Sequence, residues 1–323
     1  MEKKMIKGQR IFITGGAGFI GSALIGALLA HNQITVFDNL ERNALKDREF
    51  ADHPNLELII GNILDVPAMQ KALHHDTQVL IHCAAMAGIE PVLKNPVKTM
   101  HVNMIGSANV LAAAAGLADC RRVVCFSTSE IFGQYAMNSK ESENTAIGRV
   151  GEARWTYAVS KLAQDHLAMA YHQAQGLPVT VLRPFNIYGP GQVGASAMRN
   201  FILNALKNEP IEIHGSGTQI RAWCYVDDMI DATLRSIEEP RAVGELFNIG
   251  NQMAIVTVAE LAAIIVRILN SRSPVAFKHK NYLDVEERIP DTSKAKEILG
   301  FEASIGLEEG IRRTAQYYQR IMA

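Results

Sequence analysis

Two side chains in the segment "WTYAVSK" (155–161) have the types and the spacing needed to move a proton. Tyr157 and Lys161 stand four residues apart in a stretch whose apolar residues recur at helical spacing, so both project from one face of the predicted helix. A phenol with a pKa of about 10 is a poor base at neutral pH. An ammonium group beside it stabilises the phenolate, which can then accept a proton from an alcohol or sugar hydroxyl. Such a pair also occurs by chance on surface helices, so the rest of the chain must decide its meaning.

Three glycines in "ITGGAGFIGS" predict a dinucleotide site. Gly15, Gly18 and Gly21 follow a predicted strand and open a predicted helix, where missing side chains let a pyrophosphate approach the helix N-terminus. The next predicted strand ends in Asp38, near the spacing of about 20 residues expected for a carboxylate that binds an adenosine ribose. Because a carboxylate repels a 2′-phosphate, the pattern favours NAD over NADP. The alternative is that Asp38 and Asn39 only form a turn.

The segment "FSTSEIFG" (126–133) places polar side chains where an apolar strand ends. In a doubly wound sheet, ligands bind beyond the carboxyl ends of the strands, so we expect this segment to face the nicotinamide and Tyr157. Thr128 would then hydrogen-bond the hydroxyl being oxidised, and Glu130 would offer a second acid/base group. Alternatively, Thr128 and Ser129 cap a local turn and Glu130 is solvated.

Short apolar runs alternate with amphipathic runs through about the first 180 residues, which predicts an α/β fold with a doubly wound parallel (Rossmann) sheet. The predicted strands are 10–14, 33–38, 56–61, 78–85, 121–127 and 178–183. The predicted helices between them are 19–31, 66–75, 95–115 and 153–175. After about residue 185 the rhythm becomes irregular, which predicts a smaller C-terminal α/β substrate lobe, with helices at 196–208, 227–238, 257–269 and 307–321. We expect an NAD-binding domain over 1–185, to which 224–250 returns, and a nucleotide-sugar-binding lobe over 186–323.

The composition excludes several classes of protein. The chain has 323 residues, is 48% hydrophobic and carries a formal net charge of −1, without the basic stripe of a nucleic-acid-binding protein. No apolar run approaches the ~18 residues of a membrane span. The N-terminal segment "MEKKMIKGQR" lacks the apolar core of a signal peptide, so we expect a cytoplasmic protein. No C-x-x-C pair is present, and the aspartates of "DDMID" (227–231) suit a helix N-terminus, so we expect no metal site.

These motifs together resemble the extended short-chain dehydrogenase/reductase family of NAD-dependent nucleotide-sugar epimerases, dehydratases and decarboxylases. Over almost the whole chain the resemblance adds "RPFNIYGPG", "GSGTQIRAWCYVDD", "FNIGN" and "RIPDTSKAKEILGF" to the motifs above. It implies that the catalytic residues are Thr128, Tyr157 and Lys161, with Glu130 as a further group. The cofactor-binding residues that we expect are Gly15, Gly18, Phe19, Ile20, Gly21, Asp38, Asn39, Asn62, Ile63, Ala84, Ala85, Asn103, Tyr157 and Lys161. The substrate-binding residues that we expect are Thr128, Ser129, Asn186, Arg221 and Arg288.

Details of the motifs favour one branch of this family. Asn62 departs from the aspartate usual in relatives, although an amide still accepts and donates hydrogen bonds to an adenine. "STSE" followed by an aliphatic residue, an aromatic residue and glycine resembles UDP-glucuronate decarboxylases and GDP-mannose 4,6-dehydratases, whereas 4-epimerases usually lack the glutamate. Ala222 after Arg221 resembles UDP-xylose synthases, while the segment 85–96, expected to be a loop, departs from their pattern.

We therefore favour decarboxylation of UDP-glucuronate through a 4-keto intermediate. The alternatives are a nucleotide-sugar 4-epimerase or 4,6-dehydratase and, in a different class, a non-catalytic NAD-sensing regulator or scaffold. The resemblance also implies a homodimer that packs through helices 96–115 and 154–174.

Overall fold

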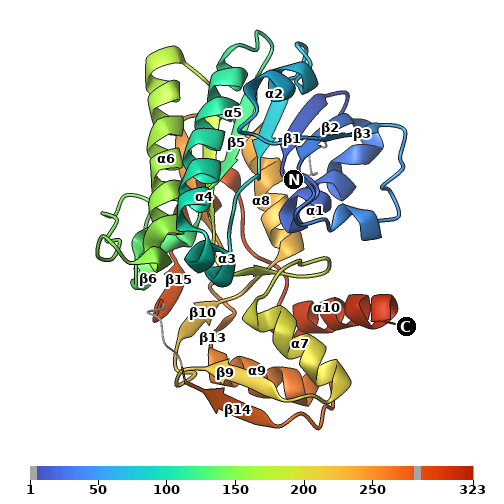
Figure 1. Ribbon diagram of the computed structural model, residues 1–323, viewed down its shortest axis with the longest axis vertical. Helices are drawn as coiled ribbons and strands as arrows, with labels where there is room; N and C mark the ends of the chain where they lie inside the picture. The colour runs from blue at the N-terminus through green and yellow to red at the C-terminus, as the bar shows by residue number, and fades with distance from the viewer. Residues whose placement is uncertain (1–5, 280–284, 323) are drawn as a thin grey trace.

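A seven-stranded parallel sheet forms the centre of the protein (Figure 1). The computed structural model describes residues 6–279 and 285–322, so the first five residues of the basic N-terminal segment lie outside the described residues. The strand order is β12-β7-β5-β4-β1-β2-β3. The strands are β1 (Arg10–Thr14), β2 (Gln33–Asp38), β3 (Leu56–Ile60), β4 (Val79–His82), β5 (Arg122–Phe126), β7 (Val179–Pro184) and β12 (Glu245–Ile249). The predicted doubly wound Rossmann sheet is confirmed.

The central strands read as apolar runs because helices cover both faces of the sheet. Helices α1 (Phe19–Leu28) and α8 (Val226–Glu238) pack on one face. Helices α2 (Val66–Ala72), α5 (Gly106–Ala115) and α6 (Thr156–Gln175) pack on the other. The chain continues along β2 and β3 on one side of β1 and along β4 on the other, which opens a crevice at the carboxyl ends of β1 and β4.

A smaller lobe is formed mainly by elements that follow β7 in the chain, together with one strand, β6, that precedes it. Its four-stranded sheet has the order β13-β10-β15-β6. These strands are β13 (Ile255–Thr257), β10 (Ile220–Ala222), β15 (Glu287–Pro290) and β6 (Tyr135–Ser139). Two parallel pairs join β8 (Ile187–Tyr188) to β11 (Cys224–Tyr225) and β9 (Ile211–His214) to β14 (Val275–Lys278). Its helices are α7 (Ala197–Lys207), α9 (Val258–Ile268) and α10 (Leu307–Met322).

Several predicted elements differ from the structure at their ends. The predicted strand 78–85 ends at His82, after which the backbone turns into the wall of a cavity. The segment 85–96 is not a simple loop, because it contains helix α3 (Ile89–Lys94). The predicted helix 95–115 consists of α4 (Pro96–Met100), a π-helical turn η3 (His101–Ile105) and α5. The predicted helix 66–75 ends at Ala72.

Short single turns connect these elements. The 3-10 turns are η1 (Leu29–His31), η2 (Leu45–Asp47), η4 (Ser129–Phe132), η5 (Ala153–Trp155) and η6 (Pro240–Ala242), and a second π-helical turn is η7 (Ala295–Leu299). The predicted helix 153–175 therefore begins as η5 and becomes α-helical at Thr156.

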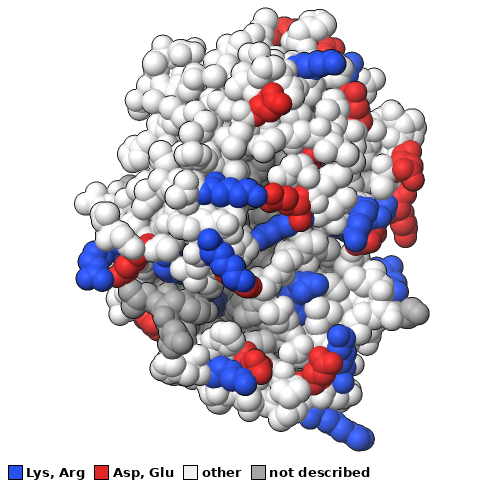
Figure 2. Space-filling view, viewed as in Figure 1, with Lys and Arg blue, Asp and Glu red and all other residues white. Residues whose placement is uncertain are grey.

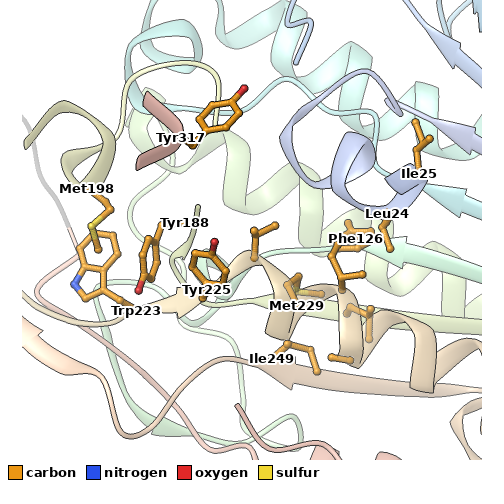
Figure 3. Packing of buried hydrophobic residues seen from close by; sticks show 14 of the residues in the cluster. Leu24, Ile25, Phe126, Tyr188, Met198, Trp223, Tyr225, Met229, Ile249 and Tyr317 are labelled. Carbon is orange, nitrogen blue, oxygen red and sulfur yellow. The ribbon is translucent and has the colours of Figure 1, made fainter. Parts of the chain in front are cut away.

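One apolar core joins the large sheet to the smaller lobe (Figure 3). Tyr188 packs edge-on against Trp223 and Tyr225, with ring centroids 6.3 and 5.6 Å apart. Trp223 is buried in this core. On the face shown in Figure 2, basic and acidic side chains are interspersed. Within the described residues, no helix is long and apolar enough to cross a bilayer.

Candidate active site

The turn between β1 and α1 packs so closely against neighbouring backbone that Gly15 and Gly21 have no space for a Cβ. Gly15 has φ of +71°, and a Cβ there would lie 2.4 Å from the Ala84 backbone nitrogen. A Cβ on Gly21 would lie 2.6 Å from the Gly15 carbonyl oxygen. Gly18 is the N-cap residue of α1. Because it has no side chain, no capping group competes with an anion for the amides of the first helical turn. The turn therefore has the backbone shape and the helix dipole that bind a phosphate.

Asp38, the last residue of β2, presents its carboxylate at the edge of the same site. Its Oδ2 accepts a hydrogen bond from the Ala17 amide (3.0 Å) and its Oδ1 accepts one from the Leu40 amide (2.7 Å). Burial raises the pKa of Asp38, and the backbone amides oppose that rise. Asn39 also shapes the turn, because its Oδ1 accepts a hydrogen bond from the Glu41 amide. Asp38 thus both forms a turn and lines the cavity described next.

A cavity of about 480 Å³ lies beyond the carboxyl ends of β1, β2 and β4. All predicted cofactor-binding residues except Asn103 line it, namely Gly15, Gly18, Phe19, Ile20, Gly21, Asp38, Asn39, Asn62, Ile63, Ala84, Ala85, Tyr157 and Lys161. The smaller lobe adds Gln192, Val193 and Ala195 to its wall, which the sequence reasoning did not identify. The structure therefore brings the glycine turn, the Asp38 carboxylate and the tyrosine–lysine pair to one cavity.

Asn103 lies behind the wall of this cavity. It is fully buried, accepts a hydrogen bond from the Met86 amide (2.8 Å) and donates to the Met86 carbonyl oxygen (3.0 Å). Its Nδ2 also donates to Ser160 Oγ on α6 (3.0 Å). Met86 lines the cavity, so Asn103 holds the wall in place and is not itself a lining residue. It belongs to η3, and π-helical turns are frequent at functional sites.

Tyr157 stands in the first turn of α6 and lines the cavity. Protein packed around its hydroxyl raises the pKa of Tyr157, and the charge of Glu130 raises it further. A hydrogen bond with Thr128 and the charges of Arg288 and Arg42 act in the opposite direction. The protein by itself therefore keeps Tyr157 a neutral phenol near pH 7, and further positive charge is needed to make it a base.

Lys161 lies one turn after Tyr157 and is almost fully buried. Its Nζ donates to the Phe126 carbonyl oxygen (2.6 Å) and to Gln164 Oε1 (2.7 Å). Burial lowers the pKa of Lys161 to about 8, and the carboxylate of Asp165 limits the fall. The ammonium form therefore predominates at neutral pH.

The turn η4 carries Thr128, Ser129 and Glu130 to the same region. Thr128 Oγ1 accepts a hydrogen bond from the Glu130 amide (3.2 Å) and also bonds Tyr157. The predicted cap of a turn is thus present, and Thr128 also contacts Tyr157. Ser129 is buried at the start of the turn.

Glu130 is held by two arginines and is mostly buried, unlike the solvated side chain of the alternative interpretation. Arg154 Nη1 lies 2.5 Å from Glu130 Oε2, and the two side chains are 7% and 15% exposed. Arg288 Nη2 lies 3.5 Å from Glu130 Oε1. The sequence reasoning assigned no role to Arg154, although it precedes Tyr157 by three residues, a spacing that places the two on one helical face.

The other predicted substrate-binding residues lie on the smaller lobe and do not line the cavity. Arg221 on β10 and Arg288 on β15 are register partners on adjacent strands. Arg221 donates to the backbone oxygens of Val285 (2.5 Å) and Glu286 (3.2 Å). Asn186 has φ of +45° and donates to the Ala222 carbonyl oxygen (2.9 Å).

Comparisons with known proteins agree with this geometry. The model of the NAD dependent epimerase/dehydratase family matches residues 11–250. The chain is 32% identical over 325 residues to the UDP-N-acetyl-alpha-D-glucosaminuronate decarboxylase of Bacillus cytotoxicus, covering 97% of this chain and 98% of that protein. It is 32% identical over 317 residues to UDP-glucuronic acid decarboxylase 1 of Danio rerio, covering 97% of this chain and 73% of that protein. The structure of UDP-glucuronic acid 4-epimerase from Bacillus cereus in complex with UDP-glucuronic acid and NAD matches with a TM-score of 0.87 at 25% identity, covering 97% of this chain and all of that one.

The fold and the cavity define an NAD-dependent enzyme that modifies nucleotide sugars. The chain belongs to the NAD-dependent epimerase/dehydratase family. Its residues fit NAD: Gly15 and Gly21 allow a backbone turn too tight for a Cβ, and this turn and the Asp38 carboxylate line the same cavity.

Proposed function

We propose that this enzyme decarboxylates a UDP-linked hexuronate, with UDP-glucuronate as the substrate, through a 4-keto intermediate. The observation that carries the proposal is the charge cluster of Glu130, Arg154 and Arg288 beside Tyr157. Arginine forms strong, charge-assisted hydrogen bonds with carboxylates, so the two arginines suit a sugar that carries a carboxylate. The similarity to two decarboxylases of hexuronates supports the same substrate class.

The residues around the cavity divide the first half of the reaction among them. Bound NAD would supply an acceptor for the C4 hydride, which returns to C4 after C5 is protonated to give a UDP-pentose, and a positive charge that favours the Tyr157 phenolate. Tyr157 takes the proton of the C4 hydroxyl, while Thr128 hydrogen-bonds that hydroxyl and the Lys161 ammonium stabilises the phenolate. Loss of the hydroxyl proton and of the C4 hydride leaves a ketone at C4, which makes the C6 carboxylate part of a β-keto acid.

Glu130 acts in the second half of the reaction. The C5–C6 bond breaks to release carbon dioxide, and its electron pair passes into a C4–C5 enolate that must gain a proton at C5. Because Arg154 and Arg288 favour the ionised form of Glu130, we assign Glu130 to orient the water that supplies this proton.

Two other reactions use the same 4-keto intermediate. A 4-epimerase would turn the keto sugar over and return hydride to its other face, which needs no glutamate. A 4,6-dehydratase would use Glu130 to remove the C5 proton as the C6 hydroxyl leaves. The likeness to a UDP-glucuronic acid 4-epimerase is the observation that favours epimerisation as the second candidate.

A panel assay separates these reactions. The purified protein is incubated with NAD and with UDP-glucuronate, UDP-N-acetylglucosaminuronate, UDP-glucose, dTDP-glucose, GDP-mannose and a CDP-sugar, and the products are identified by mass. The proposal predicts loss of carbon dioxide from UDP-glucuronate. Glu130→Gln should slow product formation by at least ~100-fold, the usual contribution of an acid/base group. An isomer of unchanged mass, or loss of water from a neutral hexose, would refute it.

We also propose how the parts of the chain divide the work and assemble. Residues 1–185 with 224–250 would bind NAD, and the 186–323 lobe would bind the nucleotide sugar. A homodimer would pack through helices 96–115 and 154–174. The exposed apolar side chains of Val97, Ile105 and Val159 on these helices support this interface. Light scattering should give the mass of a dimer, and Ile105→Glu should give a monomer.

A further inference from the structure

A row of buried polar side chains runs from Lys161 away from the cavity. Gln164, on the next turn of α6, accepts a hydrogen bond from Lys161 Nζ at its Oε1 (2.7 Å). Its Nε2 donates to the Phe126 carbonyl oxygen (3.2 Å). Ser107 on α5 lies behind it, with Oγ 3.1 Å from the same Oε1 and 2.9 Å from His82 Nε2. Gln164, Ser107 and His82 are all 1% exposed or less.

The bonds at both ends fix the orientation of the Gln164 carboxamide. The Phe126 carbonyl can only accept, so the Gln164 NH₂ must face it and the Gln164 oxygen must face the ammonium of Lys161. Ser107 has a single O–H donor, which Gln164 Oε1 shares with the Asn103 carbonyl oxygen, 2.5 Å from Ser107 Oγ, so Ser107 supports Gln164 in part and also binds η3. Gln164 itself does not line the cavity.

An ammonium group has three N–H donors. In the described part of the chain, the Phe126 carbonyl oxygen and Gln164 Oε1 accept two of those of Lys161. One N–H is left for the cavity that Lys161 lines. We propose that Gln164 is a positioning residue, whose carboxamide oxygen, supported by Ser107, keeps the Lys161 ammonium charged and turns one of its N–H groups toward the cofactor cavity. The proposal rests on the role proposed above for Tyr157 and Lys161.

The Gln164 oxygen is important for the positive charge of Lys161, because most of the titratable groups around Lys161 are neutral. On β4 and the segment after it, burial lowers the pKa of His82 to about 3 and raises the pKa of the Cys83 thiol, so both are neutral at pH 7. On β5, burial raises the pKa of the Cys125 thiol to about 12. Tyr157 on α6 is neutral as well, because burial raises its pKa.

Asp165 is the carboxylate that supports the Lys161 ammonium electrostatically, and it also pairs with Arg183 (3.1 Å). Burial still lowers the pKa of Lys161 to about 8. Removal of the Gln164 oxygen should therefore lower the pKa of Lys161 further, into the neutral range, where loss of the ammonium would impair Tyr157.

The test follows the Lys161 ammonium itself. Protein labelled with ¹⁵N at lysine Nζ is titrated by NMR with NAD bound and no sugar nucleotide present, and the Lys161 signal is assigned by its loss in Lys161→Arg. Wild type should titrate below the usual value of a lysine, because burial lowers the pKa of Lys161. In Gln164→Leu the titration should move down by about one unit or more, the size of a charge-assisted hydrogen bond. In Gln164→Glu, which restores an oxygen and adds a charge, it should move up.

Two further variants guard against a merely structural effect. Gln173→Leu changes an exposed glutamine of the same helix and should leave the Lys161 titration unchanged. Ser107→Ala removes the support behind Gln164 and should give a smaller downward shift, which provides a readout if Gln164→Leu does not fold. The alkaline limb of the kcat/KM profile should move with the titration in each variant. An unchanged Lys161 titration in Gln164→Leu, or in Ser107→Ala where the first does not fold, would overturn the proposal. Since no sugar is present, a negative result in the substrate panel leaves this test intact.

Discussion

Replacement of Arg154 by methionine tests whether the charge cluster beside Tyr157 is a coupled buried pair. Arg154 Nη1 and Glu130 Oε2 lie 2.5 Å apart, with side chains only 7% and 15% exposed. Removal of one partner of a buried ion pair destabilises a protein by about 3–5 kcal/mol, because the other charge stays buried without its partner. Arg288, 3.5 Å from the second Glu130 oxygen, keeps part of the compensation. We therefore expect Arg154→Met to lower the free energy of unfolding by about 3 kcal/mol, at the low end of that range.

A double-mutant cycle gives the decisive comparison. Glu130→Gln together with Arg154→Met removes both charges, so the double variant should lose less than the sum of the single losses, by about 1–3 kcal/mol. The assay is urea unfolding followed by tryptophan fluorescence at pH 7. Arg149→Met is the matched control, since its side chain is 83% exposed in a pair with Glu152, and it should change the free energy by less than about 0.5 kcal/mol. Additive losses, or a loss below about 1 kcal/mol for Arg154→Met, would refute the reasoning.

Three further predictions concern the cofactor cavity and its surroundings. Gly15→Ala would place a Cβ 2.4 Å from the Ala84 backbone nitrogen, at φ +71°. The NAD affinity measured by calorimetry should therefore fall by at least ~100-fold. Gly8→Ala is the control for backbone strain alone, because Gly8 has φ +65° and no atom within 4 Å of the added Cβ, and it should keep the affinity. Burial lowers the pKa of His82 to about 3 in the folded protein. Between that pH and the ordinary pKa of a histidine, the unfolded chain therefore binds a proton at His82 while the folded protein does not. Stability should therefore fall as the pH drops from about 6.5 to 3, by roughly 3–5 kcal/mol from this residue, and urea unfolding of His82→Gln should show a weaker dependence over that range. Asp38→Ala removes the carboxylate that repels a 2′-phosphate, so the preference for NAD over NADP should fall by about 10-fold or more in binding assays, and an unchanged preference would contradict the place given to Asp38.

The parallel sheet and the place of the site were predictable from local patterns. Strands covered on both faces must be apolar along their whole length, so runs such as 10–14 and 33–38 were recognisable and lie where they were predicted. Their carboxyl ends share one edge of the sheet, which is why Gly15 and Asp38 could be expected to meet near Tyr157.

The rest of the site depends on contacts between distant segments. Arg154 and Glu130 lie on separate turns, and no periodicity in either segment indicates that they pair. Strands β6 and β15 pair across about half of the chain, and β10 has only three residues, too few for a pattern of alternating exposure. The orientation of Lys161 was also hidden, because the oxygens that hold it belong to the Phe126 backbone and to a side chain with no motif of its own.

In the proposed reaction, the C6 carboxylate leaves the sugar as carbon dioxide after oxidation at C4. The most direct measurement uses UDP-glucuronate labelled with ¹³C at C6, incubated with the protein and NAD, with labelled carbon dioxide and UDP-pentose measured together. We expect one labelled carbon dioxide for each UDP-pentose formed, and neither product from Tyr157→Phe. Recovery of all the label in a UDP-hexuronate, whether unchanged or inverted at C4, would contradict it.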